Sequence, residues 1–234
     1  RHAHAMGIKE ELKPYLSLAL GSAEVTVVEM ASALSVLSNM GIKFEPTTIK
    51  KIIDANGNVI EDNTKRKGLK ILPAPTAYTV TDMLKAVIDS GTGTNAFIGR
   101  PAAGKTGTTS DYRDAWFVGY TPDYSAVVWI GNDDFSPMER VYGGDYPAMI
   151  WSDFMKKAEE KLPVTDFKLP ESDYVEVDIC PESGLIAGAK CPSVVKRSFQ
   201  KGTEPKHICN ISHEVRQEHT VSPTAVDNKI GGDD

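Results

Sequence analysis

Apolar residues recur three or four positions apart in three stretches of the chain, the ranges 24–40, 73–90 and 147–162. This period lines one face of a helix, so each stretch is predicted to form an amphipathic helix. Glycine follows the first two stretches, at Gly41 and Gly91, and glycine commonly ends a helix. Charged residues take the opposite side of the third helix, namely Lys156, Lys157, Glu159 and Glu160. We therefore expect the apolar side of that helix to cover a sheet.

Apolar runs rich in β-branched and aromatic residues mark three predicted strands between the second and third helices. They occupy the ranges 103–109, 115–120 and 125–131, and the linkers between them suit antiparallel neighbours. An Asn-Gly pair between β-branched runs predicts a separate hairpin in the range 47–62. The pattern therefore predicts a mixed α/β (α+β) fold, in which helices cover an antiparallel sheet.

The composition changes after residue 163, where prolines become frequent and the helical period is lost. We therefore divide the chain into a domain at 1–163 and an extension at 164–234 that contains all three cysteines. Short β-branched runs at 174–179 and 194–195 predict a small strand-rich module in the extension. From His219 to the end of the chain we expect disorder.

Composition narrows the class of protein. With 234 residues, 41% of them hydrophobic, the chain can bury a substantial core. The net charge of -6 is spread without a basic patch, so nucleic acid is not an expected partner. No apolar run approaches eighteen residues, and the start at Arg1–Met6 has no signal-peptide pattern. We expect the chain to be a piece of a longer protein.

The cysteines allow one disulfide and one free thiol, and their spacing does not show which two would pair. They are Cys180, Cys191 and Cys209. Zinc is the competing interpretation, and His207 and His213 are the nearby histidines. Because the spacing contains no Cys-x2-Cys pair, the sequence alone predicts no metal site.

The stretch Ala103–Thr109, with the sequence Ala-Gly-Lys-Thr-Gly-Thr-Thr, concentrates the candidate chemistry on one predicted strand. Lys105 carries a positive charge, and the hydroxyls of Thr106 and Thr108 can donate hydrogen bonds. Gly107 removes a side chain, so another backbone can approach and pair with the strand. We therefore expect an anionic, extended ligand at this strand.

Two glycine- and hydroxyl-rich segments of the sequence are each compatible with a second interpretation. The tripeptide Lys-Thr-Gly alone is also compatible with an ordinary strand preceded by a basic loop. The stretch Gly91–Ala96 has the look of a phosphate loop, but it follows a predicted helix and lacks the Gly-Lys-Ser/Thr ending of a Walker loop. A turn is the prediction for that stretch.

Lys-Thr-Gly is the third signature of the penicillin-recognising serine acyltransferases. Together with its continuation through Asp-Ala-Trp-Phe-Val-Gly-Tyr-Thr-Pro, the range 103–122 resembles class A penicillin-binding proteins, the bifunctional peptidoglycan glycosyltransferases and transpeptidases. The ranges 18–31, 180–185 and 202–205 also resemble segments of these proteins, and the whole likeness covers roughly residues 6 to 210. The resemblance implies the C-terminal part of a penicillin-binding/serine β-lactamase-like transpeptidase fold.

The resemblance implies a D,D-transpeptidase that attacks the D-Ala-D-Ala end of a peptidoglycan stem peptide through an acyl-serine, and that β-lactams acylate. In such a site the ammonium of Lys105 and the hydroxyls of Thr106 and Thr108 hold the terminal carboxylate of the substrate. The N–H of Thr108 donates a hydrogen bond to the oxyanion. The residues carried over as catalytic are Lys105, Thr106, Gly107 and Thr108, and those carried over as substrate-binding are Lys105, Thr106, Thr108 and Thr109. The family needs no cofactor and works outside the cytoplasm. We expect a membrane anchor in a missing N-terminal part, which would be a partner of this chain.

The chain departs from the family at the nucleophile. No Ser-x-x-Lys or Ser-x-Asn precedes Lys105, and the matches that begin at Ser193 and Ser198 lie in the extension, on the wrong side of the Lys-Thr-Gly strand. We interpret both as chance matches, so no nucleophile is assigned and the chain alone is expected to be inactive. Two alternatives stay open: a non-catalytic peptidoglycan-binding module, and a relative of serine β-lactamases or D,D-carboxypeptidases.

Overall fold

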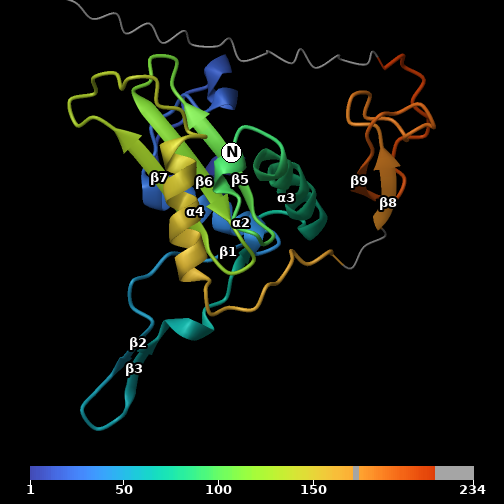
Figure 1. Ribbon diagram of the computed structural model, residues 1–234. Helices are drawn as coiled ribbons and strands as arrows, with labels where there is room; N and C mark the ends of the chain where they lie inside the picture. The colour runs from blue at the N-terminus through green and yellow to red at the C-terminus, as the bar shows by residue number, and fades with distance from the viewer. Residues whose placement is uncertain (171–173, 214–234) are drawn as a thin grey trace, which may run out of the picture. The chain divides into compact units, whose positions relative to one another are not determined.

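The computed structural model describes residues 1–170 and 174–213 (Figure 1). The disorder predicted from His219 onward lies outside these residues. Among the helices that the structure describes, none combines the length and apolar character that are needed to cross a bilayer.

The chain forms two compact units. The first contains Arg1–Val175 and Ser198–Thr203, and the second contains Glu176–Arg197 together with the described residues from Glu204 onward. The boundary that the sequence suggested after residue 163 stays a prediction.

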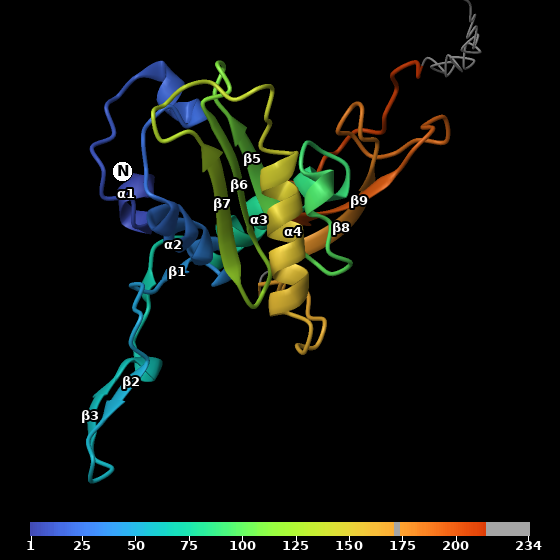
Figure 2. The same ribbon diagram turned by 60° about the vertical axis from the view of Figure 1, so that its left-hand side comes forward.

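A three-stranded antiparallel sheet is the centre of the first unit, in the order β5-β6-β7 (Figures 1 and 2). Its strands are β5 (Ala103–Thr108), β6 (Asp114–Tyr120) and β7 (Ser125–Gly131). These bounds confirm the three predicted strands to within one residue at each end. The short linkers therefore join sequential neighbours, as their lengths required.

Three helices cover the sheet, and all three were predicted from their period: α2 (Val27–Ser38), α3 (Ala74–Asp89) and α4 (Tyr146–Ala158). Figure 2 shows α4 on one face, and α2 and α3 on the other. Strand side chains alternate between faces, so Phe117 packs in the α4 layer and Tyr120 in the opposite layer. The mixed fold with a helix-covered antiparallel sheet is thus confirmed.

Each face of the sheet has its own apolar core. On the α4 side, Phe117 and Trp151 meet edge to face with ring centroids 5.2 Å apart. The buried residues of this core are Ile88, Ala96, Ala102, Phe117, Ala148, Trp151 and Met155. Those of the other core are Leu37, Ala77, Ala103 and Tyr120. The sheet is therefore packed against an apolar core on both of its faces.

Smaller elements complete the first unit. They are α1 (His2–Met6), η1 (Leu16–Leu20), β1 (Ile42–Lys43), β2 (Lys51–Ile53), β3 (Val59–Asp62), η2 (Asn63–Lys65), β4 (Leu69–Lys70) and η3 (Thr94–Ala96). Strands β1 and β4 pair, and β2 pairs with β3 to form the predicted hairpin. In its loop, the carboxylate of Asp54 accepts hydrogen bonds from the N–H groups of Asn56 and Asn58, each at 2.8 Å.

The prediction that Glu159 lies on the charged, exposed side of the last helix is wrong. Helix α4 ends at Ala158, and Glu159 turns inward, where only 1% of its surface is exposed. Its carboxylate accepts hydrogen bonds from Arg100, at 2.8 Å, and from the hydroxyl of Thr121. Arg100 also donates to the carbonyl oxygens of Glu159 and Leu162, each at 3.2 Å. Glu159 therefore anchors the helix end instead of facing solvent.

The extension contains the two-stranded sheet of β8 (Tyr174–Ile179) and β9 (Val195–Gln200). These strands confirm the strand-rich module predicted near residues 174–179 and 194–195. The second unit differs from the first in its interior. Of its described residues, Cys180 alone is buried, and neither apolar core includes any of them.

Candidate functional site

Strand β5 lies at the edge of its sheet, because β6 pairs with one side and no described strand pairs with the other. The N–H of Thr109 donates to the carbonyl oxygen of Asp114 at 3.0 Å, so it points toward β6. Backbone N–H groups of successive strand residues point to opposite edges. The N–H of Thr108 is therefore directed to the open edge.

The side chains of the Lys-Thr-Gly stretch alternate between the faces of the sheet. Lys105 pairs with Val118 in the register, whereas Thr106 pairs with Phe117, so the lysine and the threonine leave opposite faces. The ammonium of Lys105 is exposed and bends round to donate to the carbonyl oxygen of Thr106 at 2.8 Å. This contact keeps the positive charge close to the strand.

Two different loops pack against β5, and the hydroxyls of Thr106 and Thr108 contact one loop each. The Oγ1 of Thr106 lies 2.7 Å from the Oγ1 of Thr92, in the turn after α3. The Oγ1 of Thr108 accepts a hydrogen bond from the N–H of Gly143 at 2.9 Å. A hydroxyl that accepts can still donate, so the O–H of Thr108 retains the ability to bind a carboxylate.

Two adjacent glycines allow the second of these loops to approach the strand. A Cβ on Gly143 would lie 2.2 Å from the carbonyl oxygen of Trp116 and 2.5 Å from that of Gly107. A Cβ on Gly144 would lie 2.1 Å from the carbonyl oxygen of Thr92. Side chains cannot be accommodated at these separations, so the loop fits only with glycine at both positions.

Thr109 has a different local role. Its Oγ1 accepts hydrogen bonds from the N–H groups of Arg113 and Asp114, each at 2.9 Å. These bonds close the turn between β5 and β6. The substrate-binding role expected for Thr109 stays a prediction, as do the roles of Lys105, Thr106, Gly107 and Thr108.

Sequence reasoning found β5 and missed the loops that pack against it. Thr92 belongs to the stretch Gly91–Ala96, which forms the predicted turn and ends in η3. Nothing in that prediction indicated that its hydroxyl would reach β5. The Gly143-Gly144 pair was the available signal, since paired glycines before a helix can mark a close backbone approach.

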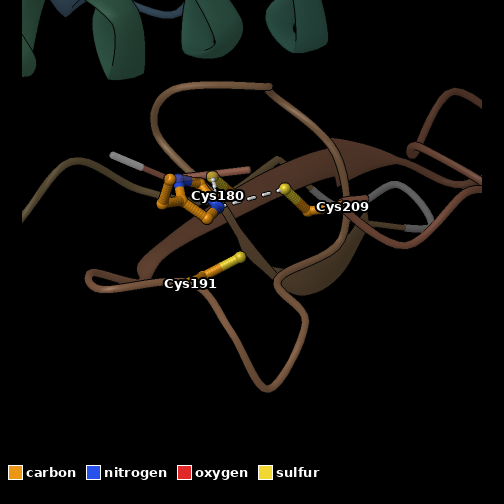
Figure 3. Close-up of side chains that lie close together, drawn as sticks. Cys180, Cys191 and Cys209 are labelled. Carbon is orange, nitrogen blue, oxygen red and sulfur yellow. Dashed lines mark hydrogen bonds between the residues drawn. The ribbon is translucent and has the colours of Figure 1, made fainter. Parts of the chain in front are cut away.

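A second cluster of chemically active groups lies in the extension. The three cysteines are free thiols that point toward one another (Figure 3). Their sulfurs and a ring nitrogen of His213 all lie within 4.8 Å of one another. A hydrogen bond from Ser183 contributes most to lowering the pKa of Cys209, to about 6. The prediction of no metal site used sequence spacing alone, and the fold brings these four side chains together from separate segments of the chain.

Two family models match the chain. The penicillin binding protein transpeptidase domain matches residues 7–156, and the C-terminal domain of penicillin-binding protein 1A matches residues 170–214. The transpeptidase match includes the whole three-stranded sheet with its Lys-Thr-Gly strand, helices α2 and α3, and α4 except for its last two residues.

Relatives and solved structures agree with these matches. The chain is 41% identical to penicillin-binding protein 1A of Aquifex aeolicus over 203 residues, which is 86% of this chain and 28% of that protein. The crystal structure of penicillin-binding protein 1A from Haemophilus influenzae has a TM-score of 0.76 at 25% identity, over 88% of this chain and 37% of that one. PonA1 of Mycobacterium tuberculosis, solved in complex with penicillin V, has a TM-score of 0.65 at 29% identity, over 73% of this chain and 51% of that one.

The chain spans about a quarter to a third of the length of its curated relatives, 28% for the Aquifex aeolicus protein and 32% for penicillin-binding protein 2D of Bacillus subtilis. The two family models nevertheless match successive parts of the chain, the transpeptidase domain first and the C-terminal domain after it. The chain belongs to the class A penicillin-binding proteins, as part of their transpeptidase domain followed by the C-terminal domain of penicillin-binding protein 1A.

Proposed function

We propose that this chain supplies the carboxylate- and oxyanion-binding part of a serine D,D-transpeptidase that cross-links peptidoglycan stem peptides. The observation that carries the proposal is the open edge of β5, toward which the N–H of Thr108 points. Lys105 and the hydroxyl of Thr108 add a cation and a donor to the same strand. Membership of the family supports this assignment.

The proposed chemistry is acyl transfer through a serine ester. The serine oxygen attacks the carbonyl carbon of the D-Ala-D-Ala peptide bond, and a tetrahedral oxyanion forms. The N–H of Thr108 donates to that oxyanion, an interaction that is typically worth about 3 kcal/mol of the barrier. The terminal D-Ala then leaves as its amine, and the amine of a neighbouring stem peptide takes the acyl group from the serine. A β-lactam carbonyl enters the same reaction and stays on the serine.

The terminal carboxylate of the substrate is the proposed partner of Lys105. A charge-assisted hydrogen bond from the ammonium of Lys105 to this carboxylate is stronger than a neutral one. The hydroxyls of Thr106 and Thr108 are proposed to donate further hydrogen bonds to the same carboxylate. Gly107 keeps the strand free of a bulky side chain, so that the extended peptide can pair with the open edge. Thr109, at the end of the same stretch, is proposed as a further substrate-binding residue.

We propose that the nucleophilic serine lies outside these 234 residues, because no Ser-x-x-Lys precedes Lys105 in them. Two exposed leucines support the docking of such a segment: Leu16 is 99% exposed and Leu20 is 91% exposed. Leaving two leucines in water forgoes about 1.5–3 kcal/mol of burial energy for each of them. We propose that the remainder of the polypeptide covers them, and that it also holds the protein at the outer surface of the cytoplasmic membrane.

A fluorescent penicillin tests this proposal. We expect no labelled band on the 234-residue chain alone under denaturing conditions, and a labelled band when the upstream segment of the same reading frame is present. The label should map to a serine of that segment. A stable adduct on Ser193 or Ser198 would overturn the assignment, and the Ser193→Ala and Ser198→Ala variants identify such an adduct.

The same experiment separates the alternatives. A non-catalytic wall-binding module would bind a D-Ala-D-Ala peptide but stay unlabelled even in the complete polypeptide. A β-lactamase relative would become labelled and then release hydrolysed penicillin rapidly, since its acyl-serine is short-lived. The transpeptidase proposal requires a persistent label in the complete polypeptide.

A further inference from the structure

The backbone of the extension brings two distant cysteines together around Ile186. Ile179 forms an antiparallel bridge with Ile186, and Ile186 forms a parallel bridge with Ile208. Cys180 and Cys209 each directly follow one of the bridged residues. The N–H of Cys209 also donates to the carbonyl oxygen of Ile186 at 2.7 Å. Their proximity therefore follows from main-chain hydrogen bonds.

Tight turns hold two of the three thiols. The N–H of Gly184 donates to the carbonyl oxygen of Cys180 at 2.8 Å, and Gly184 has a φ of 68°, which favours glycine. The N–H of Cys191 donates to the carbonyl oxygen of Gly188 at 3.0 Å, while the N–H of Gly188 points at the sulfur of Cys191 at 3.3 Å. These two bonds fix the position of the Cys191 sulfur within its turn.

The separations within the cluster match a tetrahedral zinc site. Zn–S bonds of about 2.3 Å and a Zn–N bond of about 2.0 Å place sulfur and nitrogen about 3.5 Å apart at a tetrahedral angle. The Nε2 of His213 lies 3.4 Å from the sulfur of Cys209 and 3.7 Å from that of Cys180. The sulfur of Cys191 completes a set of four ligand atoms within 4.8 Å of one another.

The other ring nitrogen of His213 has the partner that a metal-binding histidine commonly has. The Nδ1 of His213 lies 2.9 Å from a carboxylate oxygen of Glu182, and the side chain of His213 is only 6% exposed. A carboxylate in this position fixes the ring and the tautomer, and it leaves Nε2 free to bind the metal. The turn that carries Cys180 therefore also orients the fourth ligand.

The second unit also needs a source of stability other than an apolar core, because among its described hydrophobic residues only Cys180 is buried. Units this short usually depend on disulfides or a metal. One disulfide would use two of the three sulfurs and leave His213 and the third thiol unexplained. A metal uses all four groups.

We propose that Cys180, Cys191, Cys209 and His213 bind one structural Zn²⁺, with Glu182 as the partner that orients His213. Three thiolates and one imidazole make a closed tetrahedral set, as in structural zinc sites, with no position left for water. On binding, each thiol releases its proton to solvent. The inference is independent of the proposed transpeptidase activity, since all five residues belong to the second unit.

Zinc content and Co²⁺ binding test the proposal on the 234-residue chain purified with reductant. We expect about one zinc per chain by mass spectrometry of the metal, and a sulfur-to-cobalt absorption band when Co²⁺ is added to the chelated protein. Cys209→Ser and His213→Ala should lose the zinc. His207→Ala is the matched control, and it should keep both the zinc and the cobalt band.

A milder variant covers the case in which the cysteine variants do not fold. Glu182→Gln changes an exposed carboxylate and should weaken Co²⁺ binding by about 10- to 100-fold while the band itself remains. The proposal is overturned if the reduced wild-type chain gives no sulfur-to-cobalt band, or if His213→Ala binds cobalt as tightly as His207→Ala. It is also overturned if the chain isolated without reductant yields a peptide cross-linked through two of these cysteines.

Discussion

The two units of this protein are stabilised in different ways. The first clamps a three-stranded sheet between two apolar cores, in which Trp151, Phe117 and Tyr120 are completely buried. The second relies on isolated backbone bridges and on a cluster of thiols. Burial stabilises a fold in proportion to the apolar area that is removed from water. A short unit with almost no buried apolar area must therefore depend on specific bonds.

This difference also separates the two candidate sites. The edge of β5 is rigid because the strands behind it are packed on both faces, so Lys105 and the threonines can be exposed without loss of the fold. In the extension the candidate ligands are themselves the stabilising groups. We therefore expect substitutions at β5 to change chemistry, and substitutions at the thiol cluster to change structure.

The largest effect on the first unit is expected from Trp151→Ala. Trp151 is completely buried, and its indole N–H donates to the carbonyl oxygen of Ala126 at 3.1 Å. The variant should lose about 3–5 kcal/mol of unfolding free energy, measured by urea denaturation. Ile208→Ala, at a position that is 64% exposed, should cost less than about 0.5 kcal/mol. Equal losses at the two positions would remove the distinction between the units.

Glu159→Gln tests whether one buried charge pair helps to hold the first unit together. The change leaves Arg100, which is 14% exposed, without its carboxylate, and such a break commonly costs about 3 kcal/mol or more. Glu160→Gln is the matched control, because Glu160 pairs with Lys157 at 2.7 Å in an exposed position. That exposed pair should contribute no more than about 0.5 kcal/mol. If the two variants unfold at the same urea concentration, the buried pair does not anchor α4.

Lys105→Ala should separate chemistry from stability within the first unit. In the complete polypeptide we expect acylation by a β-lactam to slow by about one to two orders of magnitude, because a charge-assisted hydrogen bond of roughly 1.5–3 kcal/mol is lost. Most of the loss should fall in kcat/KM, since the contact forms between free enzyme and transition state. The melting temperature should not change.

Lys156→Ala, on the exposed side of α4, is the control for the loss of one positive charge. It should leave both the acylation rate and the melting temperature unchanged. If Lys105→Ala also acylates at the wild-type rate, Lys105 does not bind the substrate carboxylate, and the assignment of the β5 edge fails with it.

Sequence periodicity was sufficient for the helices and strands of the first unit, because each is specified by neighbouring residues. It was insufficient for Glu159, whose burial depends on Arg100, 59 residues earlier in the chain. The charged side of a helix is predicted from local spacing, and a single distant cation reversed the prediction for this residue. Local patterns carry no information about such pairings.

The candidate sites show the same limit. Lys-Thr-Gly identified β5, but the contacts of Thr106 with Thr92 and of Thr108 with Gly143 join residues 14 and 35 positions apart. The thiol cluster spans a similar separation along the chain, since Cys180 and His213 are 33 positions apart. A spacing rule built on Cys-x2-Cys cannot detect ligands that are assembled by bridges through Ile186.

The smallest effect is expected at the start of α2, on the exposed margin of the first unit. The Oγ1 of Thr26 accepts a hydrogen bond from the N–H of Glu29 at 3.2 Å, and the carboxylate of Glu29 accepts one from the N–H of Thr26 at 3.1 Å. Thr26→Ala should therefore cost about 1 kcal/mol of unfolding free energy at neutral pH. Thr47→Ala, at an exposed threonine outside any helix, is the control and should cost less than half as much.

The pH dependence of this helix cap provides a second measurement on the same pair of residues. Hydrogen bonds from the N–H groups of Thr26 and Lys9, and from the hydroxyl of Thr26 at 2.9 Å, lower the pKa of Glu29 below its usual value of 4.5. Thr26→Ala removes the hydroxyl bond and keeps the two backbone bonds, so the variant loses only part of this lowering. A lowered pKa adds stability that is fully present above the usual value and is lost as the pH falls through the folded value. The difference between wild type and Thr26→Ala should therefore shrink as urea denaturation is repeated at successively lower pH below 4.5. A difference that stays constant over that range would mean that the Thr26 hydroxyl acts alone, without the Glu29 carboxylate as its partner.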